Sequence, residues 1–346
     1  MSVIAIVGSG MMGSAMSFPA RDRGNEVRLV GTPLDREIIS HARETSWHLT
    51  LKRRLPEGIR YFQIEQLKEA LSGADVVIGG VSSFGVDWFI DHVLPVIPDS
   101  LPVLSITKGL LDTDDGDLVT YPHLYAQRSK RKISFNAVGG PCTSYELADR
   151  DPTHVCFCGP DIGLLRAFRE MLTTDYYHIS LSTDIVGVES AVALKNAYAL
   201  GVSLAIGLSE KQNGIGSTPH YNSQAALFLQ SVREMQTLIT HLGGHENNIA
   251  YGAGDLYVTV FGGRTRLIGT LLGRGYTMDQ AMAELKGITL ESLVIATRAA
   301  RAVRKKAQRG ELKAEDYPLL THIDRVINFN EPVDLPWGAF ETEFRG

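Results

Sequence analysis

Residues 2–13 read SVIAIVGSGMMG, a short apolar run followed by three glycines in the spacing GxGxxG. The apolar run is typical of a buried parallel strand, and the glycines come where such a strand would turn into a helix. The first glycine permits a tight turn, the second lets the backbone approach a pyrophosphate, and the third lets helix and strand pack closely. The start of the helix would offer free N–H groups to the phosphates. We therefore predict a dinucleotide-binding loop, formed by Gly8, Ser9, Gly10, Met11, Met12 and Gly13.

The segments that follow alternate between strand-like and helix-like patterns. Short apolar runs predict further strands at residues 26–30, 59–62, 75–79, 103–107, 133–139, 154–158 and 176–180. Helical patterns occur between them at residues 34–44, 64–71, 86–94 and 162–172, and the basic segment 45–56 is expected to be a loop. Strands that alternate with helices indicate an α/β doubly wound (Rossmann) parallel sheet, whose ligands bind at the carboxyl ends of the strands.

The end of the second strand bears on the choice between NAD and NADP. NAD sites usually carry an acidic side chain there for the ribose 2′-hydroxyl, whereas NADP sites carry basic or small polar groups. This chain continues with GTPLDR, so that Thr32 lies near the strand tip and Asp35 comes late for the acidic position. Arg36 could meet a 2′-phosphate. The sequence is therefore compatible with NAD or NADP.

Polar side chains follow other strands of the predicted sheet. Ser82 follows the strand at residues 75–79, and Lys108 follows the strand at residues 103–107. Residues 139–146, GGPCTSYE, predict a tight turn into a helix. A lysine at the carboxyl end of a strand faces the ligand crevice, so Lys108 is a candidate to orient an anionic or carbonyl oxygen. The alternative is an ordinary surface lysine in a loop.

Residues 185–207, IVGVESAVALKNAYALGVSLAIG, predict a long helix that is apolar on nearly every face and therefore buried. Its length would suit a membrane span, but Lys195 near its middle and the lack of a second such run argue against one. A buried lysine is costly unless something offsets its lost hydration. Lys195 is therefore either a structural lysine, which snorkels or pairs with a carboxylate such as Glu189, or a catalytic group in proton transfer.

After about residue 183 the strand patterns stop. Further helices are predicted at residues 222–242, 277–285, 290–308 and 318–326. We therefore predict a Rossmann domain at residues 1–183, an all-α substrate and catalytic domain at residues 184–330, and a tail at residues 331–346.

A second polar cluster lies at residues 252–266, GAGDLYVTVFGGRTR. Asp255 could hold the ammonium of a lysine. The glycines predict a loop around Arg264, where close backbone approach and a guanidinium would suit a phosphate or carboxylate. The alternative for the arginines is simple exposure to solvent.

Composition narrows the class of protein. The chain of 346 residues is 44% hydrophobic and 21% charged, as expected for a soluble globular protein of about two domains. Its net charge of -5 gives no reason to expect nucleic-acid binding. The beginning MSVIAIVG lacks the features of a signal peptide, and the three cysteines are expected to be reduced, so we expect a cytoplasmic protein. No metal ligands are assigned.

Taken together, these motifs resemble the NAD(P)-dependent glycerol-3-phosphate dehydrogenase family. The resemblance runs along most of the chain, through GSGMMG at residues 8–13, TKG at 107–109, GGPxxxxE at 139–146, LKNAYAL at 194–200, NSQAAL at 222–227 and GAGDLYVTVFGGRTRLIG at 252–269. The LKN and GDL blocks, in this order and spacing, are the specific ones, because GxGxxG alone occurs in many families.

The resemblance implies a role for each matching residue. Lys195 matches the catalytic lysine of the family, and Lys108 and Asp255 match its active-site partners. Arg264 matches the arginine that binds the substrate phosphate, with Thr259 on the same wall of the site. The substrate-binding set is Lys108, Thr259, Arg264 and Thr265, and the cofactor-binding set beyond the glycine loop is Thr32, Ser82, Ser144, Arg264 and Glu291.

Three positions depart from the family pattern. Thr265 stands where asparagine is usual, Ser144 where a small alanine is usual, and Ser82 where proline is common. Thr265 lacks an amide that would contact the substrate, so the substrate could differ from that of the family.

The resemblance implies reversible hydride transfer between a nicotinamide and the secondary alcohol of glycerol 3-phosphate, or the ketone of dihydroxyacetone phosphate, with Lys195 as general acid and base. A homodimer that binds neither nucleic acid nor membrane is expected. The alternatives are a reductase of the same two-domain plan, acting on a polyol phosphate, ketopantoate or a β-hydroxyacid, and a sensor that binds the cofactor without chemistry.

Overall fold

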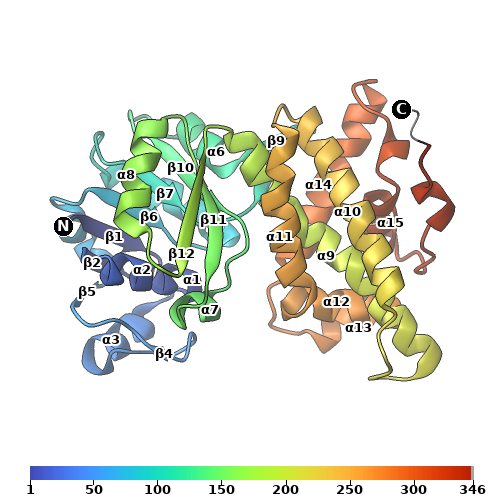
Figure 1. The fold of residues 1–346 in the computed structure, drawn as a ribbon, viewed down its shortest axis with the longest axis horizontal. Helices are drawn as coiled ribbons and strands as arrows, with labels where there is room; N and C mark the ends of the chain where they lie inside the picture. The colour runs from blue at the N-terminus through green and yellow to red at the C-terminus, as the bar shows by residue number, and fades with distance from the viewer. Residues whose placement is uncertain (344–346) are drawn as a thin grey trace. The chain divides into compact units, whose positions relative to one another are not determined.

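The computed structural model describes residues 1–343, which form two compact units (Figure 1). Unit 1 consists of Met1–Lys108 and Thr120–Glu189, and unit 2 consists of Gly109–Val119 and the chain from Ser190 onward. Each unit has a hydrophobic core of its own. A chain of this length is large enough for two such cores.

Unit 1 is built on a sheet of eight strands in the order β12-β11-β10-β7-β6-β1-β2-β5. Neighbouring strands are parallel except β10 and β11, which are antiparallel. The strands are β1 (Val3–Val7), β2 (Glu26–Val30), β5 (Ile59–Phe62), β6 (Val76–Gly79), β7 (Val103–Ser105), β10 (Phe135–Gly139), β11 (Thr153–Cys158) and β12 (Tyr177–Ser182). Each apolar run predicted as a strand is in this sheet, and the predicted fold class is confirmed.

The direction of chain winding reverses beside β1. From β1 the chain goes outward to β2 and β5, and then returns to β6 on the other side of β1. Val7 is the register partner of both Val30 and Gly79, so these strands end at the same edge of the sheet. A crevice at such a reversal is where open α/β sheets bind their ligands.

Helices cover both faces of the sheet (Figure 1). On one face Ile6 of β1 shares a buried cluster with Phe18 and Phe168. On the other face Tyr125 packs against Phe135, with ring centroids 5.7 Å apart. The α-helices of unit 1 are α1 (Met11–Ala15), α2 (Ser17–Asp22), α3 (Arg36–Thr45), α4 (Leu67–Leu71), α5 (Val86–Trp88), α6 (Tyr121–Arg128), α7 (Ser144–Ala148) and α8 (Ile162–Leu172). Single turns η1 (Ile64–Gln66), η2 (Ser83–Gly85), η3 (Phe89–Val93) and η4 (Leu94–Val96), and a small hairpin of β3 (Trp47–His48) and β4 (Arg53–Arg54), complete it.

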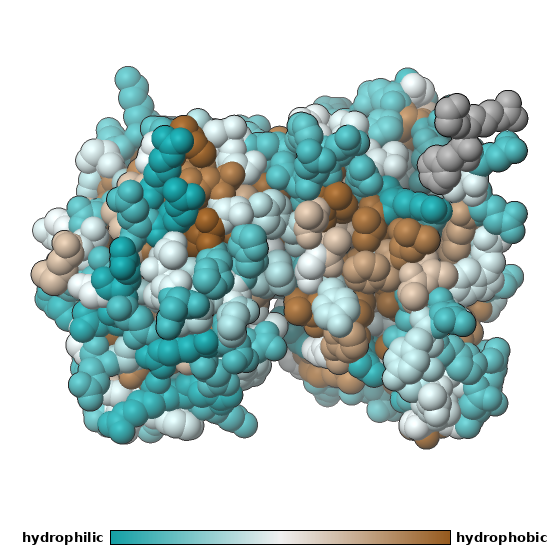
Figure 2. Space-filling view, in the orientation of Figure 1, coloured by the Kyte–Doolittle hydropathy of each residue, from teal (hydrophilic) through white to brown (hydrophobic). Residues whose placement is uncertain are grey.

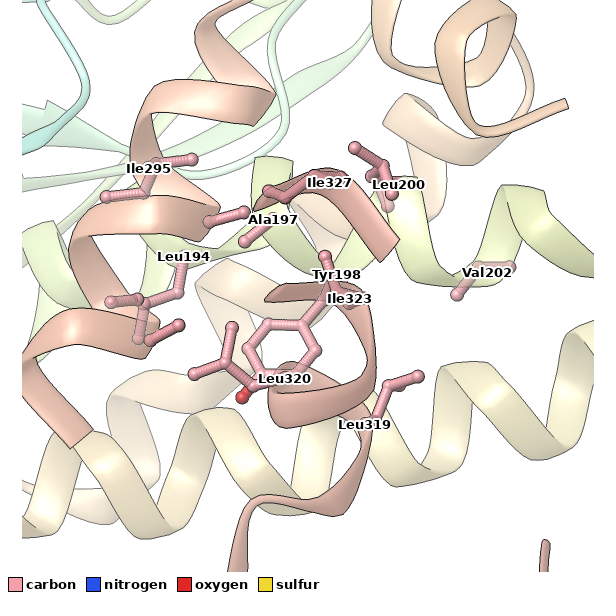
Figure 3. Close-up of a cluster of buried hydrophobic side chains, with 14 of the residues drawn as sticks. Leu194, Ala197, Tyr198, Leu200, Val202, Ile295, Leu319, Leu320, Ile323 and Ile327 are labelled. Carbon is pink, nitrogen blue, oxygen red and sulfur yellow. The ribbon is translucent and has the colours of Figure 1, made fainter. Parts of the chain in front are cut away.

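Unit 2 is helical and is organised around α9 (Ile185–Asn213), which continues beyond its predicted end at residue 207. In Figure 3, Leu194 and Tyr198 of α9 lie among side chains of two other helices, including Ile295 and Leu320. The two helices are α14 (Glu291–Gln308) and α15 (Pro318–Phe329). The other α-helices of the unit are α10 (Tyr221–His241), α11 (Ile249–Val260), α12 (Gly263–Arg274) and α13 (Met278–Glu284). Two single turns, η5 (Glu246–Asn248) and η6 (Ala314–Asp316), lie between helices, and a third, η7 (Trp337–Phe340), follows α15. The strands β8 (Leu110–Asp112) and β9 (Leu118–Thr120) come earlier in the chain, before α6.

Packing accounts for the unusual hydrophobicity of α9. Within residues 1–343 it is the one helix whose length and composition would suit a membrane span, and 83% of its most apolar window is buried. A helix that is apolar on all sides is expected at the centre of a helical domain.

The structure corrects one sequence-based expectation in this unit. Residues 252–266, predicted to include a glycine-rich loop, instead form most of α11 and the start of α12, separated only by Phe261 and Gly262. Glycines in and near this segment serve two purposes. A Cβ on Gly252 would lie 2.7 Å from the carbonyl oxygen of Ala191 on α9, and one on Gly269 would lie 2.6 Å from Cβ of Ser203, so these two permit close packing. Gly262 and Gly263 instead lie at the short turn between the helices, where Gly263 has φ +80°.

The hairpin of β8 and β9 was not anticipated from the sequence. It begins directly after Lys108 and is attached to α14 by charged contacts. Arg298 donates to the carbonyl oxygen of Leu110 at 2.8 Å and forms an ion pair with Asp112 at 3.3 Å. Lys306 pairs with Asp117 at 2.7 Å. The chain that leaves Lys108 is therefore held by unit 2.

The crossing of α9 and α12 gives a test of this packing. A Cβ on Gly273 would lie 2.8 Å from Cα of Gly207 and would collide with the carbonyl oxygen of Leu204. Gly273→Ala should force the helices apart and lower the free energy of unfolding by about 1–3 kcal/mol, measured by urea denaturation. Gly338→Ala is the control, because a Cβ there has no neighbour within 4 Å. Equal stabilities for the two variants would contradict the close crossing.

Candidate active site

The glycine loop after β1 has the backbone geometry that its sequence predicts. Gly8 has φ +108°, and its N–H donates to the carbonyl oxygen of Val30 at 2.9 Å. A Cβ on Gly13 would collide with the carbonyl oxygen of Gly8. A Cβ on Gly10, which precedes α1, would instead meet nothing within 4 Å. The loop is thus tight against the sheet and open at Gly10, as a pyrophosphate cradle requires. Met11 and Met12 are the first residues of α1.

Two side chains that the sequence analysis did not assign hold Ser9 in this loop. The carboxylate of Asp35 accepts from the Ser9 N–H at 3.2 Å. His48 Nδ1 accepts from the Leu51 N–H at 3.0 Å, so its Nε2 carries the proton and donates to the Ser9 carbonyl oxygen at 2.8 Å. Burial lowers the pKa of His48, which favours this neutral form. His48 comes from the basic segment expected to be a solvated loop, which gave no signal of its role.

The tip of β2 is joined to the same loop. Asp35 also accepts from the N–H of Thr32 at 2.9 Å and from its hydroxyl at 2.8 Å. Arg36 forms an ion pair with Glu65, and both side chains are largely exposed. Thr32 is partly exposed beside this network. Asp35, which comes too late in the sequence for the usual acidic position, therefore connects the tip of β2 to the glycine loop.

The next parallel strands place further predicted residues at this edge. Ser82 is exposed after β6, where it precedes the turn η2. Ser144 is buried as the first residue of α7, after β10. Lys108 follows β7, and its ammonium donates to the carbonyl oxygen of Gly140 at 2.8 Å. Because β6, β7 and β10 are parallel neighbours, their carboxyl ends lie at one edge of the sheet.

In unit 2 the structure brings together Lys195, Asp255 and Thr259. The ammonium of Lys195 donates to Oδ1 of Asp255 at 2.6 Å and to Oγ1 of Thr259 at 3.0 Å. The side chain of Lys195 is 12% exposed and that of Asp255 is 2% exposed. Thr259 in turn donates to the backbone carbonyl oxygen of Asp255 at 2.7 Å. The carboxylate that Lys195 contacts is therefore Asp255 and not Glu189.

The position of α11 makes this contact possible. Ala191 and Lys195 lie one turn apart on α9, and Gly252 and Asp255 lie one turn apart on α11. Because Gly252 has no side chain, α11 approaches the backbone at Ala191 closely. Asp255 is thereby within hydrogen-bonding distance of the Lys195 ammonium.

The remaining predicted residues lie at the starts of two other helices. Arg264 is exposed in the first turn of α12, and Thr265 beside it is buried. Glu291 is the first residue of α14. Among residues 1–343, no group of three or more His, Cys, Asp or Glu side chains is placed to hold a metal ion.

Comparison with known proteins identifies the family. The sequence model described as the NAD-dependent glycerol-3-phosphate dehydrogenase N-terminus matches residues 3–162, and the one described as its C-terminus matches residues 184–335. An NADP(+)-dependent glycerol-3-phosphate dehydrogenase of Archaeoglobus fulgidus is 36% identical over 82% of this chain and 84% of its own length. A glycerol-3-phosphate dehydrogenase [NAD(P)+] of Koribacter versatilis is 30% identical over 88% of each chain.

Solved structures agree on the fold. Glycerol-3-phosphate dehydrogenase from Plasmodium falciparum superposes with a TM-score of 0.82 at 20% identity, covering 100% of this chain and 96% of that one. The enzyme from Coxiella burnetii gives a TM-score of 0.78 at 23% identity, covering 98% and 97%. With both halves matched by the family models, this chain belongs to the NAD-dependent glycerol-3-phosphate dehydrogenase family.

Proposed function

We propose that this protein is an NAD(P)-dependent dehydrogenase that interconverts glycerol 3-phosphate and dihydroxyacetone phosphate. The observation that carries the proposal is the buried contact of Lys195 with Asp255 and Thr259, in a chain of this family. A lysine held at fixed geometry by a carboxylate and a hydroxyl is suited to transfer a proton to or from an oxygen.

Lys195 is the general acid and base of the proposed mechanism. During ketone reduction the carbonyl oxygen gains negative charge, and Lys195 gives it a proton, while alcohol oxidation reverses the transfer. Asp255 and Thr259 accept hydrogen bonds from the ammonium and so fix its direction. Such general acid–base assistance typically contributes about 10²–10⁴-fold to the rate. Lys108, at the sheet edge of unit 1, has the proposed role of a hydrogen-bond donor to a substrate oxygen.

The glycine loop holds the cofactor, either NAD or NADP. Gly10 leaves open space where a Cβ would stand, and the N–H groups at the start of α1 follow it, which fits a pyrophosphate. When bound there, the nicotinamide cofactor supplies or accepts the hydride. His48 and Asp35 keep the Ser9 peptide in place, and Thr32, Ser82, Ser144, Arg264 and Glu291 complete the proposed contacts.

Arg264 binds the phosphate of the substrate in this proposal. It lies in the first turn of α12, a helix of 12 residues whose N-cap residue Gly262 makes no side-chain cap. The guanidinium and the N–H groups of the helix start both suit an anion. Binding energy from the phosphate then positions the reacting carbon.

Thr265 favours a second candidate function within the same reaction class. It stands where the family usually has asparagine, and it is buried in the first turn of α12. A polyol phosphate or a β-hydroxyacid could therefore be the substrate. The solved ketopantoate reductase of Ralstonia eutropha shares this fold with a TM-score of 0.52 at 14% identity, which shows the fold alone. A sensor without chemistry is disfavoured, since a buried Lys195–Asp255 contact is an expensive feature without a reaction to serve.

The direct test follows oxidation of NADH, and separately of NADPH, with dihydroxyacetone phosphate, its unphosphorylated analogue and longer keto-phosphates. We expect rapid turnover only with the three-carbon phosphate, because Arg264 recognises an anion and the bound phosphate positions the carbonyl. Faster turnover of a longer or unphosphorylated ketone would contradict this substrate assignment. Cofactor binding without turnover of any ketone would contradict the dehydrogenase function.

Lys195→Met should reduce kcat by at least about 10²-fold while cofactor affinity, measured by fluorescence titration of NADH, stays near wild type. The change removes the proton donor and leaves the glycine loop intact. Lys211→Met is the matched control, because Lys211 is an exposed lysine at the other end of α9 and should keep its activity. Full activity of the Lys195 variant would contradict the mechanism.

We also propose that the protein is a cytoplasmic homodimer without nucleic-acid or membrane partners. Among residues 1–343 the three cysteines form no disulfide, which suits a reducing compartment. Tyr221 and Leu229 of α10 and Tyr257 of α11 are each more than half exposed, and Figure 2 shows brown surface around α10. An apolar area of this kind is typical of an interface. Sedimentation equilibrium should give twice the chain mass of 37.9 kDa. A monomer at micromolar concentration would contradict the proposed dimer. Recovery of the protein in a membrane fraction would contradict the proposed cytoplasmic location.

A further inference from the structure

Glu189 is a buried acid for which the mechanism above has no use. It lies in the first part of α9, within unit 1, and is 0% exposed. Neither of its carboxyl oxygens has a hydrogen-bond partner among residues 1–343. A buried ionised carboxylate without partners is very costly, so the group is expected to hold a proton unless a nearby cation stabilises its charge.

A second buried glutamate shows that this arrangement is not a consequence of burial alone. Glu234 of α10 is 1% exposed and accepts four hydrogen bonds. Its donors are the Gln230 amide at 2.8 Å, the Tyr198 hydroxyl at 3.1 Å, and the N–H groups of Leu319 and Leu320 at 2.7 and 2.9 Å. Glu234 is thus a fully bonded structural acid, and Glu189 is not.

The charged and titratable groups that face Glu189 come from several elements of unit 1. Lys108, after β7, is the cation whose charge acts on it. Tyr125 of α6 and Cys158 of β11 interact electrostatically with Glu189, and burial raises the pKa of both, so they stay neutral at ordinary pH. Asp184, before α9, also acts electrostatically on Cys158. The electrostatic partner of Glu189 is therefore Lys108.

Glu189 changes its charge within the pH range in which enzyme activity is usually measured. Burial raises the pKa of Glu189, and the Lys108 cation opposes this, with a resulting value of about 8. The carboxyl is neutral below that pH and negative above it. Lys108 meanwhile donates to the Gly140 carbonyl oxygen at 2.8 Å, so its ammonium is held near the edge of the sheet.

We propose that Glu189 is a positioning residue for the dehydrogenase reaction that acts through Lys108. As a neutral carboxyl it leaves the charge of the Lys108 ammonium available to the substrate oxygen, and as a carboxylate it draws that charge inward. The inference rests on the proposed function, which gives Lys108 its role.

The direction of the effect follows from the charge that develops in the reaction. Ketone reduction builds negative charge on the substrate oxygen, and a cation directed at that oxygen stabilises it. When Glu189 ionises, its negative charge offsets that cation. The rate of ketone reduction should therefore fall as pH rises through about 8.

Glu189→Gln keeps the size of the side chain and makes it permanently neutral. In the wild type, kcat/KM for ketone reduction should decline as pH rises through about 8, whereas the variant should lack this decline. One pH unit above that value, the variant should exceed the wild type by about three- to tenfold. Well below it the two should agree, because both side chains are neutral there. Glu189→Leu, also neutral, serves the same comparison if glutamine is not tolerated.

Glu234→Gln is the control for loss of a buried carboxyl in general. It removes a buried acid from the core of unit 2 and should leave the pH profile of kcat/KM as in the wild type. Infrared difference spectra should also show a protonated carboxyl in the wild type near neutral pH that is missing from Glu189→Gln.

Three results would overturn the inference. If the enzyme is active but wild type and Glu189→Gln have superimposable pH profiles of kcat/KM, this inference is refuted while the proposed function stands. The same holds if Glu234→Gln shows the altered profile expected of Glu189→Gln. Absence of the protonated carboxyl band would do the same. A wild type that turns over no ketone would refute the proposed function, and this inference with it.

Discussion

The constraint on which unit 2 depends is that an ammonium in its interior must be compensated. Lys195 lies on α9, whose other side chains are almost all apolar, and Asp255 is the carboxylate that it contacts. Removing one partner of such a pair typically costs about 3–5 kcal/mol, because the other charge is left buried. The pair adds little to stability compared with two apolar side chains of the same size. What it fixes is the alignment of α9 with α11, and with it the direction of the lysine.

Close helix packing is the condition for that alignment. Gly252 lets α11 approach α9 at Ala191, and Gly207 and Gly273 do the same where α12 crosses it. Ordinary side chains at these positions would widen the contacts and carry Asp255 away from Lys195. Gly252, which the sequence placed in a glycine-rich segment, therefore helps to hold Asp255 against Lys195.

Much of the fold could be predicted because burial is visible in the sequence. Continuous apolar runs such as residues 2–7 fit a parallel strand buried on both faces, and α9 is too apolar to be anything but a core helix. Two features could not be predicted this way. The helices α11 and α12 carry glycines whose role depends on a distant neighbour, and the hairpin after Lys108 is held by ion pairs with α14. Hydrophobic periodicity predicts neither a close contact at a glycine nor an ion pair between distant segments.

The candidate site residues also differ in whether the sequence indicates them. Lys195 and Lys108 could be selected as candidates because a charged residue in an apolar helix or at a strand end is conspicuous, and Asp255 because it belongs to a polar cluster. His48 instead donates to the backbone of Ser9, a contact that no motif records.

Glu189 shows the same limit, since the sequence does not indicate that its carboxyl lacks hydrogen-bond partners among residues 1–343 whereas that of Glu234 has four. The pKa of Glu189 is raised to about 8 from an ordinary 4.5, so the folded state binds the extra proton. Its contribution to stability is therefore present at low pH and is lost as pH rises from about 4.5 to about 8. A leucine would avoid that loss, and an acid that costs stability in the working range of pH is best explained by the lysine beside it.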